Sequence, residues 1–258
     1  MVIVVAYAKC WPMFQLDVKA AFLHGPLEEE VYVQQLPGFI NEGGEGENLL
    51  IICLYVDDLL ITRSNPERLE ELKRVMQSDF EMTDLGKLSY FLGMDFTYTA
   101  AGLILHQKKY AKELLGRFGM TVCNSARSLI EVNLKLAKNK TEEDAEETVF
   151  KQIVGSLRFL CNSILDLSFD VGLISRFMNN PKKSHMLTAK RLLRYVKGTV
   201  DFGILFPIGR HKTDGESLEL IGFMDSDHGG DCLERKSTLG YIFMLNGSLI
   251  SCVQRSSK

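Results

Sequence analysis

The sequence lacks any excess of positive charge: in 258 residues, 30 Lys and Arg face 33 Asp and Glu, for a net charge of −3. That balance excludes a protein that holds nucleic acid through a uniformly basic surface, so such binding would need a local patch. Long hydrophobic runs are missing too, since no window reaches the roughly 18 consecutive apolar residues of a membrane span. The apolar opening, residues 1–8, has no basic residue before it and is interrupted at Lys9. We therefore expect neither a membrane span nor a signal peptide.

Cysteine pairs at the spacing of zinc sites or redox motifs are absent as well. The six cysteines are scattered along the chain: Cys10, Cys53, Cys123, Cys161, Cys232 and Cys252. A secreted protein of this size usually shows tighter cysteine use, so we expect an intracellular, reducing compartment, the cytoplasm or the nucleus.

What the sequence does contain is enough apolar material for a folded core, with 46% hydrophobic residues. Three polar breaks divide the chain, at residues 41–48, 141–148 and 209–217. The second break carries five carboxylates that repel one another, which predicts a solvated linker.

Two carboxylates mark a hairpin in the first part of the chain. The apolar runs 49–56 and 59–62 are joined only by Asp57 and Asp58, which predicts a tight hairpin with both acids in its turn. Asn65 as N-cap and Pro66 at the first helical position predict a helix directly after it. The runs 1–8 and 49–56 are each only long enough for a buried strand.

The remaining pattern predicts helices followed by strands, and hence an α+β fold. The expected helices are 107–118, 150–178 with a break near 165–168, and 184–197. The expected strands are 220–224, 240–245 and 249–253, the last two joined by the hairpin signal Asn246-Gly247.

The helix at 184–197 has two distinct faces. Its spacing places Leu187, Leu192 and Val196 toward a core and Lys190, Arg194 and Lys197 on another face. The basic face has two interpretations: an ordinary solvated surface, or a contact with the phosphates of a nucleic-acid duplex.

The acid pair also has two interpretations. Asp is common in turns because its side chain bonds nearby backbone groups. Alternatively, two carboxylates at the end of a rigid hairpin repel one another, and a divalent cation removes that repulsion. Asp17 favours the second interpretation, because it ends a predicted strand and can meet Asp57 and Asp58 across a sheet. Nucleotidyl transfer by two Mg²⁺ ions, about 3.5 to 4 Å apart, needs carboxylates that meet in this way.

Several motifs stand in a fixed order along nearly the whole chain. In the first part they are the segment around Asp17, residues 25–32 and 37–39, Tyr55-Val56-Asp57-Asp58, Asp84-Leu85-Gly86 and 90–93. Beyond the acidic break they are 153–157, 175–178, 189–195, 197–199, Asp225-Ser226-Asp227 and 235–241. The first set resembles the reverse transcriptase of copia-type retrotransposon Pol polyproteins. The second set resembles that family's connection to ribonuclease H and the start of its ribonuclease H domain.

The resemblance implies specific roles. Asp17 is the expected first palm carboxylate, Asp57 the second metal ligand and Asp58 its partner acid, with Mg²⁺ or Mn²⁺ as cofactor. Tyr55 is expected to lie under the primer end. For a member of this family, the second interpretation of the basic helix face would make Lys190, Arg194 and Lys197 contacts with the phosphates of a template-primer duplex. Asp225 is the expected first metal ligand of an incomplete ribonuclease H site. The implied partners are an RNA or DNA template-primer and a dNTP, with no membrane involved; no oligomeric state is indicated.

The resemblance also implies a division of the chain. The expected parts are a partial palm with an antiparallel sheet and helices (1–98), a palm or thumb extension (99–140), an acidic linker (141–149), a helical connection (150–208) and a truncated ribonuclease H-like sheet (218–258).

Three departures from the family bear on activity. Only residues 38–48 stand in place of a much longer stretch between the palm acids, the fingers region before Asp17 is missing, and the later acids of ribonuclease H are missing. Phosphoryl transfer depends on positioning and electrostatic stabilisation, which those parts supply. We therefore expect a degenerate, catalytically impaired reverse transcriptase homologue. The alternatives are an active two-metal polymerase palm and a non-catalytic nucleic-acid-binding remnant.

Overall fold

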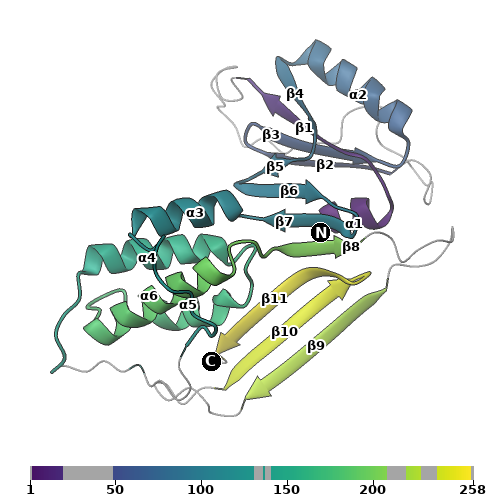
Figure 1. The fold of residues 1–258 in the computed structure, drawn as a ribbon. Coiled ribbons are helices and arrows are strands. Elements are labelled where there is room, and N and C mark those ends of the chain that lie inside the picture. Colours follow the sequence, from purple (N-terminus) through teal and green to yellow (C-terminus); the bar gives the residue numbers. More distant parts are fainter. Residues whose placement is uncertain are drawn as a thin grey trace, which may run out of the picture. The chain divides into compact units, whose positions relative to one another are not determined.

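The computed structural model describes residues 2–19, 49–130, 136, 141–207, 219–227 and 237–256. The chain forms two compact units, Met1–Leu92 and Gly93–Pro207 with Ser217–Lys258 (Figure 1). The described residues form six helices and antiparallel sheets, which confirms the predicted α+β class. None of those six helices is long and apolar enough to cross a bilayer. The stretches 20–48 and 208–218 and the motif residues 235–236, with the predictions made for them, lie outside the described residues.

The first unit is built on a four-stranded antiparallel sheet. Its strands are β1 (Met13–Val18), β2 (Leu50–Tyr55), β3 (Asp58–Arg63) and β4 (Met82–Lys87), in the order β2-β3-β1-β4. Helix α2 (Pro66–Asp79) packs its Leu69, Leu72 and Met76 against Leu16 and Ile61 of the sheet. Asn65 accepts the Arg68 N–H, so the predicted helix start is confirmed.

The N-terminal apolar run was predicted as a strand, and this prediction is wrong. Residues Val2–Ala8 form helix α1, with Val4 and Ala6 buried. A short apolar run does not by itself distinguish a buried strand from a buried helix, and here tertiary packing overrides the strand preference of valine.

The predicted hairpin is present, but its turn is one residue earlier than expected. Tyr55 pairs with Asp58, so the turn consists of Val56 and Asp57, and Asp58 begins β3. Val56 takes a left-handed conformation with φ of 57°, which is unusual for a β-branched residue. The shift separates the two acids: Asp57 lies in the turn and Asp58 in the sheet.

The second unit begins just after the two-residue strand β5 (Tyr90–Phe91). It contains strands β6 (Met94–Tyr98), β7 (Gly102–His106) and β8 (Ile204–Pro207), paired antiparallel in that order. Its four helices are α3 (Lys108–Arg117), α4 (Glu147–Leu160), α5 (Leu167–Ser175) and α6 (Lys183–Gly198). These helices share one apolar core that includes Leu114, Phe150, Leu157, Ile174 and Leu193. The predicted helices and the break near 165 are confirmed, although Leu187 is 68% exposed rather than in the core.

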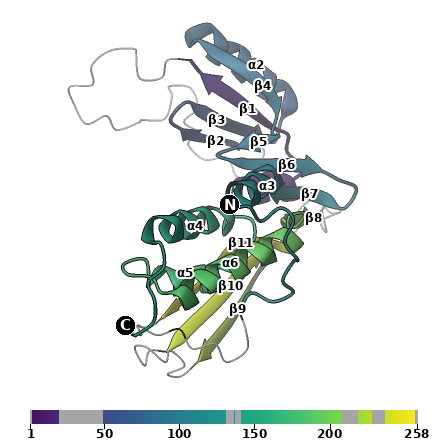
Figure 2. The ribbon, with the colours of Figure 1, turned by 60° about the vertical axis from the view of Figure 1, so that its left-hand side comes forward.

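A separate three-stranded sheet lies in the same unit (Figures 1 and 2). Its strands are β9 (Leu220–Asp227), β10 (Thr238–Leu245) and β11 (Ser248–Ser256), in the order β11-β10-β9. Asn246 and Gly247 both have positive φ, 49° and 74°, as a tight primed turn requires. The predicted hairpin is therefore confirmed.

The acidic segment predicted as a solvated linker contacts α6. Glu142 accepts hydrogen bonds from the Ser184 backbone N–H (2.6 Å) and hydroxyl (2.9 Å), and Lys182 and Lys183 pair with Asp144 and Glu143. The positive end of the α6 dipole and the two lysines offset the repulsion among these acids. Helix α4 starts at Glu147, within the predicted linker, while the predicted domain boundaries themselves stay predictions.

Candidate metal-binding site

Asp17 and Asp58 lie directly opposite each other on neighbouring strands of the first sheet. The β1–β3 register pairs Asp17 with Asp58 and Leu16 with Leu59. One step further, the Val18 N–H donates to the Asp57 carbonyl oxygen at 2.8 Å. Because hydrogen-bonded and non-hydrogen-bonded pairs alternate along an antiparallel ladder, Asp17 and Asp58 form a non-hydrogen-bonded pair, the kind with Cα atoms about 4.5 Å apart and closer side chains. The fold thus brings together two carboxylates that stand 41 positions apart in the sequence.

Gln15 orients one of these carboxylates, and the sequence reasoning did not identify it. Its Nε2 atom donates to Asp58 Oδ1 at 3.2 Å, and the residue is only 5% exposed. Gln15 lies two residues before Asp17, so both side chains are on the same face of β1. Its place two residues before a predicted catalytic acid in a predicted strand is the sequence signal for a shared face, while its contact with Asp58 depends on the alignment of β1 with β3.

Asp57, the third predicted ligand, is exposed in the turn, where its backbone carbonyl anchors Val18. Across the part of the chain that the structure describes, no three His, Cys, Asp or Glu side chains gather as metal ligands. The structure therefore joins Asp17 with Asp58, and the role of Asp57 stays a prediction.

The opposed pair fits a hard divalent cation in its donor chemistry. Mg²⁺ prefers oxygen ligands and is often held by only one or two carboxylates, with water and phosphate oxygens completing its coordination. Like charges directly across a sheet are destabilising, so a bound cation would also relieve repulsion between Asp17 and Asp58. When bound, Mg²⁺ or Mn²⁺ would supply Lewis-acid chemistry at this end of the two central strands.

Tyr55 lies beside the carboxylate pair. It is directly opposite Asp58 in the β2–β3 register and 58% exposed. Directly opposite residues share a face of the sheet, so the Tyr55 ring is on the face that carries Asp17 and Asp58. This placement is compatible with a ring that contacts nucleic acid, as predicted.

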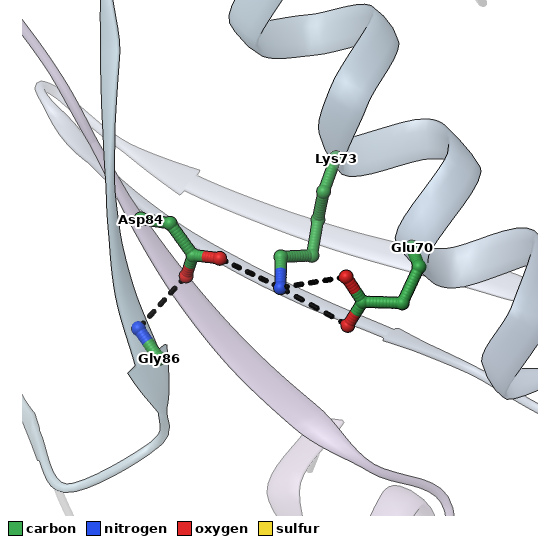
Figure 3. Close-up of polar contacts among 4 residues, drawn as sticks. All are labelled: Glu70, Lys73, Asp84 and Gly86. Atoms are coloured by element: carbon green, nitrogen blue, oxygen red, sulfur yellow. Dashed lines mark hydrogen bonds and ion pairs between the residues drawn. The ribbon is translucent and has the colours of Figure 1, made fainter.

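A buried lysine supports β1 from the other face of the sheet. Lys73 of α2 pairs with Asp84 of β4 at 2.7 Å and with Glu70 at 3.1 Å (Figure 3). Its ammonium group lies 4.0 Å from the centre of the Phe14 ring on β1. The cluster therefore links α2 to β4 and to β1, the strand that carries Asp17, and these two strands pair with each other.

The charges in this cluster stabilise one another. Burial alone would lower the pKa of Lys73, but its hydrogen bonds to Asp84 and Glu70 outweigh burial and raise that pKa. Burial would raise the pKa of Asp84, but Lys73 and the Gly86 N–H, which donates at 2.8 Å, lower it instead. Both groups stay charged near neutral pH.

The basic face of α6 is largely used within the protein. Arg194 Nε donates to the Asn124 carbonyl oxygen at 2.8 Å, and Lys197 Nζ donates to that of Cys123. Arg191 donates to Ser128 Oγ at 2.9 Å. These bonds fix the segment after α3 against α6. Lys190 is exposed on the same helix, so contact of this face with nucleic acid stays a prediction.

Asp225 is exposed on β9, opposite Gly240 of β10. Among the described residues it belongs to no group of three or more possible ligand side chains, and the side chain of Asp227 is not described.

A second pair of acids lies at the start of α5, in the second unit. Asp170 is 7% exposed, and burial together with repulsion from Asp166 raises its pKa to about 6. Asp166 accepts a hydrogen bond from the Tyr195 hydroxyl, and burial and that contact raise the Tyr195 pKa to about 12. The sequence reasoning gave these residues no role.

Comparison with known proteins identifies relatives. Residues 1–46 and 43–131 match the family described as "Reverse transcriptase (RNA-dependent DNA polymerase)". The chain is 29% identical to the retrovirus-related Pol polyprotein from transposon RE1 of Arabidopsis thaliana, over 98% of this chain and 20% of that protein. It is 31% identical to the corresponding polyprotein from transposon TNT 1-94 of Nicotiana tabacum, over 95% of this chain and 22% of that protein.

A shorter relative matches this chain over most of its own length. The chain is 34% identical to an uncharacterized mitochondrial protein of Arabidopsis thaliana, over 78% of this chain and 81% of that protein. The chain spans about a fifth of the length of the Pol polyproteins that it matches. No solved structure matches it significantly.

Proposed function

Since this chain belongs to the reverse transcriptase family of copia-type Pol polyproteins, we propose that it is a degenerate polymerase palm that keeps its metal-binding carboxylates but is catalytically impaired. The observation that carries the proposal is the direct opposition of Asp17 and Asp58, with Asp57 next to them in the turn. In this proposal Asp17, Asp57 and Asp58 are the residues that hold Mg²⁺ or Mn²⁺, and Gln15 orients Asp58.

The impairment follows from a shortened internal stretch. The alignment with the RE1 polyprotein runs over 301 positions but includes only 98% of the 258 residues, about 253, so about 48 positions have no residue here. The family match also divides into two segments that meet at residues 43–46, between Asp17 and Asp57. A shortened stretch between the acids removes groups that would position template and nucleotide, and phosphoryl transfer depends on such positioning.

We also propose that the three-stranded sheet corresponds to the beginning of a ribonuclease H domain, with Asp225 as its first metal ligand. This assignment is supported by the match to the Pol polyproteins over nearly the whole chain and by the exposure of Asp225 on β9. Hydrolysis by a metal-activated water needs several acids around the ions, so no nuclease activity is expected from Asp225 alone.

Primer extension tests the proposal. The chain is incubated with an RNA template, a DNA primer, dNTPs and Mg²⁺ or Mn²⁺, next to a variant carrying Asp57→Ala and Asp58→Ala. We expect no template-dependent extension from either protein. Extension by the unmodified chain that is lost in the variant would overturn the proposed impairment and establish an active palm.

A binding titration addresses the non-catalytic alternative. Affinity for an RNA–DNA hybrid is measured at two salt concentrations, because phosphate contacts weaken steeply as salt rises. With Arg194 and Lys197 bonded to backbone carbonyl groups, we expect weak binding with a shallow salt dependence. Tight, steeply salt-dependent binding that a Lys190→Ala variant weakens would instead support a nucleic-acid-binding remnant.

A further inference from the structure

Thr83 of β4 lies directly opposite Asp17, on the side of β1 away from Asp58. The β1–β4 register pairs Asp17 with Thr83. Two positions further, the Lys19 N–H donates to the Glu81 carbonyl oxygen at 2.8 Å. Because hydrogen-bonded pairs recur at every second position of an antiparallel ladder, Asp17 and Thr83 form a hydrogen-bonded pair, the kind with Cα atoms about 5.5 Å apart. Directly opposite residues share a face of the sheet, so the Thr83 side chain is on the face that carries Asp17 and Asp58.

One row of side chains therefore crosses all four strands of this sheet. It consists of Tyr55, Asp58, Asp17 and Thr83, one residue each from β2, β3, β1 and β4. The Cβ atoms of directly opposite residues are about 4.5–5.5 Å apart, so the side-chain oxygen atoms of Asp58 and Thr83 flank Asp17 on its two sides. Thr83 is exposed, and its hydroxyl group is therefore accessible to a hydrated ion on this face.

Strand β4 has a bulge next to this row. Gly86 lies opposite Gln15. The next residue of β1, Leu16, lies opposite Asp84, so Leu85 is one extra residue in β4. Gly86 has φ of 80°, a conformation that glycine adopts without a steric cost. Bulges are frequent beside functional sites, where they redirect a side chain.

The bulge decides which side chain of β4 faces the acids. Without the extra residue, the register would continue unshifted and Asp84 would lie opposite Asp17, which would add a third carboxylate to their face. The bulge instead turns Asp84 to the other face, where Lys73 of α2 pairs with it at 2.7 Å (Figure 3). Thr83 takes the position opposite Asp17, and it offers a neutral oxygen atom that does not repel the two acids.

A lysine close to this row is paired with a different acid. Lys19 is two residues after Asp17, and its ammonium group lies 3.3 Å from the Glu81 carboxylate. Glu81 therefore balances the charge of Lys19, while the repulsion between Asp17 and Asp58 is left for a bound cation to offset.

We propose that Thr83 is a further ligand of this site, whose hydroxyl oxygen binds the divalent cation next to the Asp17 carboxylate. A threonine or serine hydroxyl holds Mg²⁺ in the same manner in phosphate-binding loops, and oxygen donors suit a hard cation. This inference rests on the proposed function, since it adds a residue to the cation site of Asp17, Asp57 and Asp58.

A Mn²⁺ titration of the full chain, followed by electron paramagnetic resonance, tests the proposal. Thr83→Val keeps the branched shape of the side chain but removes the hydroxyl group, whereas Thr83→Ser keeps the hydroxyl group. The control is Thr148→Val, at an exposed threonine of α4 in the second unit. We expect the dissociation constant for Mn²⁺ to rise at least about tenfold in Thr83→Val. It should stay close to the value of the unmodified chain in Thr83→Ser and in the control.

The possible failures are distinguishable. If Thr83→Val binds Mn²⁺ as tightly as the unmodified chain while Asp17→Asn loses binding, this inference is wrong and the proposed function stands. If the unmodified chain binds no Mn²⁺, or Asp17→Asn binds it equally well, both are wrong. Equal weakening by Thr83→Ser and Thr83→Val would also overturn the inference, because the hydroxyl group would then not be the cause. If Thr83→Val alters the circular dichroism of the chain, Thr83→Ala replaces it and must show the same loss of affinity.

Discussion

At the scale of single residues, the acids of this protein are in very different surroundings. Asp84 is compensated by Lys73 and a backbone N–H, and Asp58 has the Gln15 amide. Asp170 is 93% buried beside Asp166. Burying a carboxylate without compensation favours its protonated form, so Asp170 weakens the fold at neutral pH.

Replacing Asp170 by Asn should therefore stabilise the protein in a pH-dependent way. The pKa of Asp170 is raised from its ordinary value of 3.8 to about 6, so the folded state binds a proton more tightly than the unfolded state. Stability is then lost as pH rises from about 4 through 6 and stays reduced above. We expect Asp170→Asn to raise the free energy of unfolding by about 1–2 kcal/mol at pH 8.

Urea unfolding at pH 5 and pH 8 checks this prediction, with the pH 5 measurement as the internal control. The gain should be clearly smaller at pH 5, where Asp170 of the folded protein is largely protonated. An equal gain at both pH values would show that the charge of Asp170 is not the cause.

At the scale of secondary-structure elements, the Lys73 cluster holds α2 to the sheet. Replacing Lys73 by Met keeps most of the apolar stem over Phe14 but leaves Asp84 and Glu70 without their cation. We expect a loss of about 1–3 kcal/mol at pH 7, reduced from the full value of a buried pair because Asp84 and Glu70 are partly exposed. Lys19→Met, which breaks the exposed Lys19–Glu81 pair, is the control and should cost less than about 1 kcal/mol.

The pH dependence of this loss has a fixed sign. The pKa of Asp84 is lowered in the folded protein, so its contribution is present above its unfolded value and is lost as pH falls through the folded value. Denaturant melts from pH 7 down to pH 3 should show the difference between the Lys73→Met variant and the unmodified chain shrinking. A constant difference would mean that the lost packing of the lysine stem, and not its charge, is responsible.

Two glycines give opposite predictions because their surroundings differ. Gly102 begins β7 with φ of 151°, and a Cβ there would lie 2.1 Å from the Phe206 carbonyl oxygen of β8. Gly102→Ala should therefore cost about 2–4 kcal/mol. Gly155 is exposed within α4, and a Cβ there meets nothing within 4 Å. Gly155→Ala should stabilise by about 0.5–1 kcal/mol. Thermal melts should show a lower melting temperature for Gly102→Ala and a higher one for Gly155→Ala. A lower melting temperature for Gly155→Ala would contradict this prediction.

The elements were largely predictable from sequence where local signals were strong. Asn65-Pro66 marked the start of α2 and Asn246-Gly247 marked a hairpin, and both follow from local chemistry. Residues Val2–Ala8 and the side chain of Leu187 were placed wrongly, because a short apolar run and a single leucine take their environment from tertiary packing. The turn at Val56-Asp57 was misplaced by one residue, because valine rarely adopts a positive φ and Asp-Asp was the better turn signal.

The candidate site was predictable in its residue types but not in its pairing. Asp17 was identified as a lone acid at the end of a predicted strand, and Asp58 as one of two acids in a predicted turn. That Asp17 could meet the turn acids across a sheet was expected, but its direct opposition to Asp58 depends on a strand register that the sequence pattern does not provide. Gln15 was missed, since its role appears only once β1 and β3 are aligned. The docking of Glu142 on α6 was missed for the same reason, because a run of like charges was read without its cationic partners.

At the scale of the whole molecule, the chain covers about a fifth of the Pol polyproteins that it matches. It nevertheless forms two units with their own sheets and buried residues. The buried Asp170 opposes stability at neutral pH, and such an uncompensated acid fits the proposal of a degenerate, catalytically impaired chain.

The central claim is that Asp17 and Asp58 form a cation site at the end of β1 and β3. A Mn²⁺ titration followed by electron paramagnetic resonance tests it most directly, on the unmodified chain and on Asp17→Asn, with Asp79→Asn on α2 as the control. The account predicts that the unmodified chain and the control bind Mn²⁺ at one shared site and that Asp17→Asn loses it. Equal Mn²⁺ binding by all three proteins, or no binding by the unmodified chain, would contradict it.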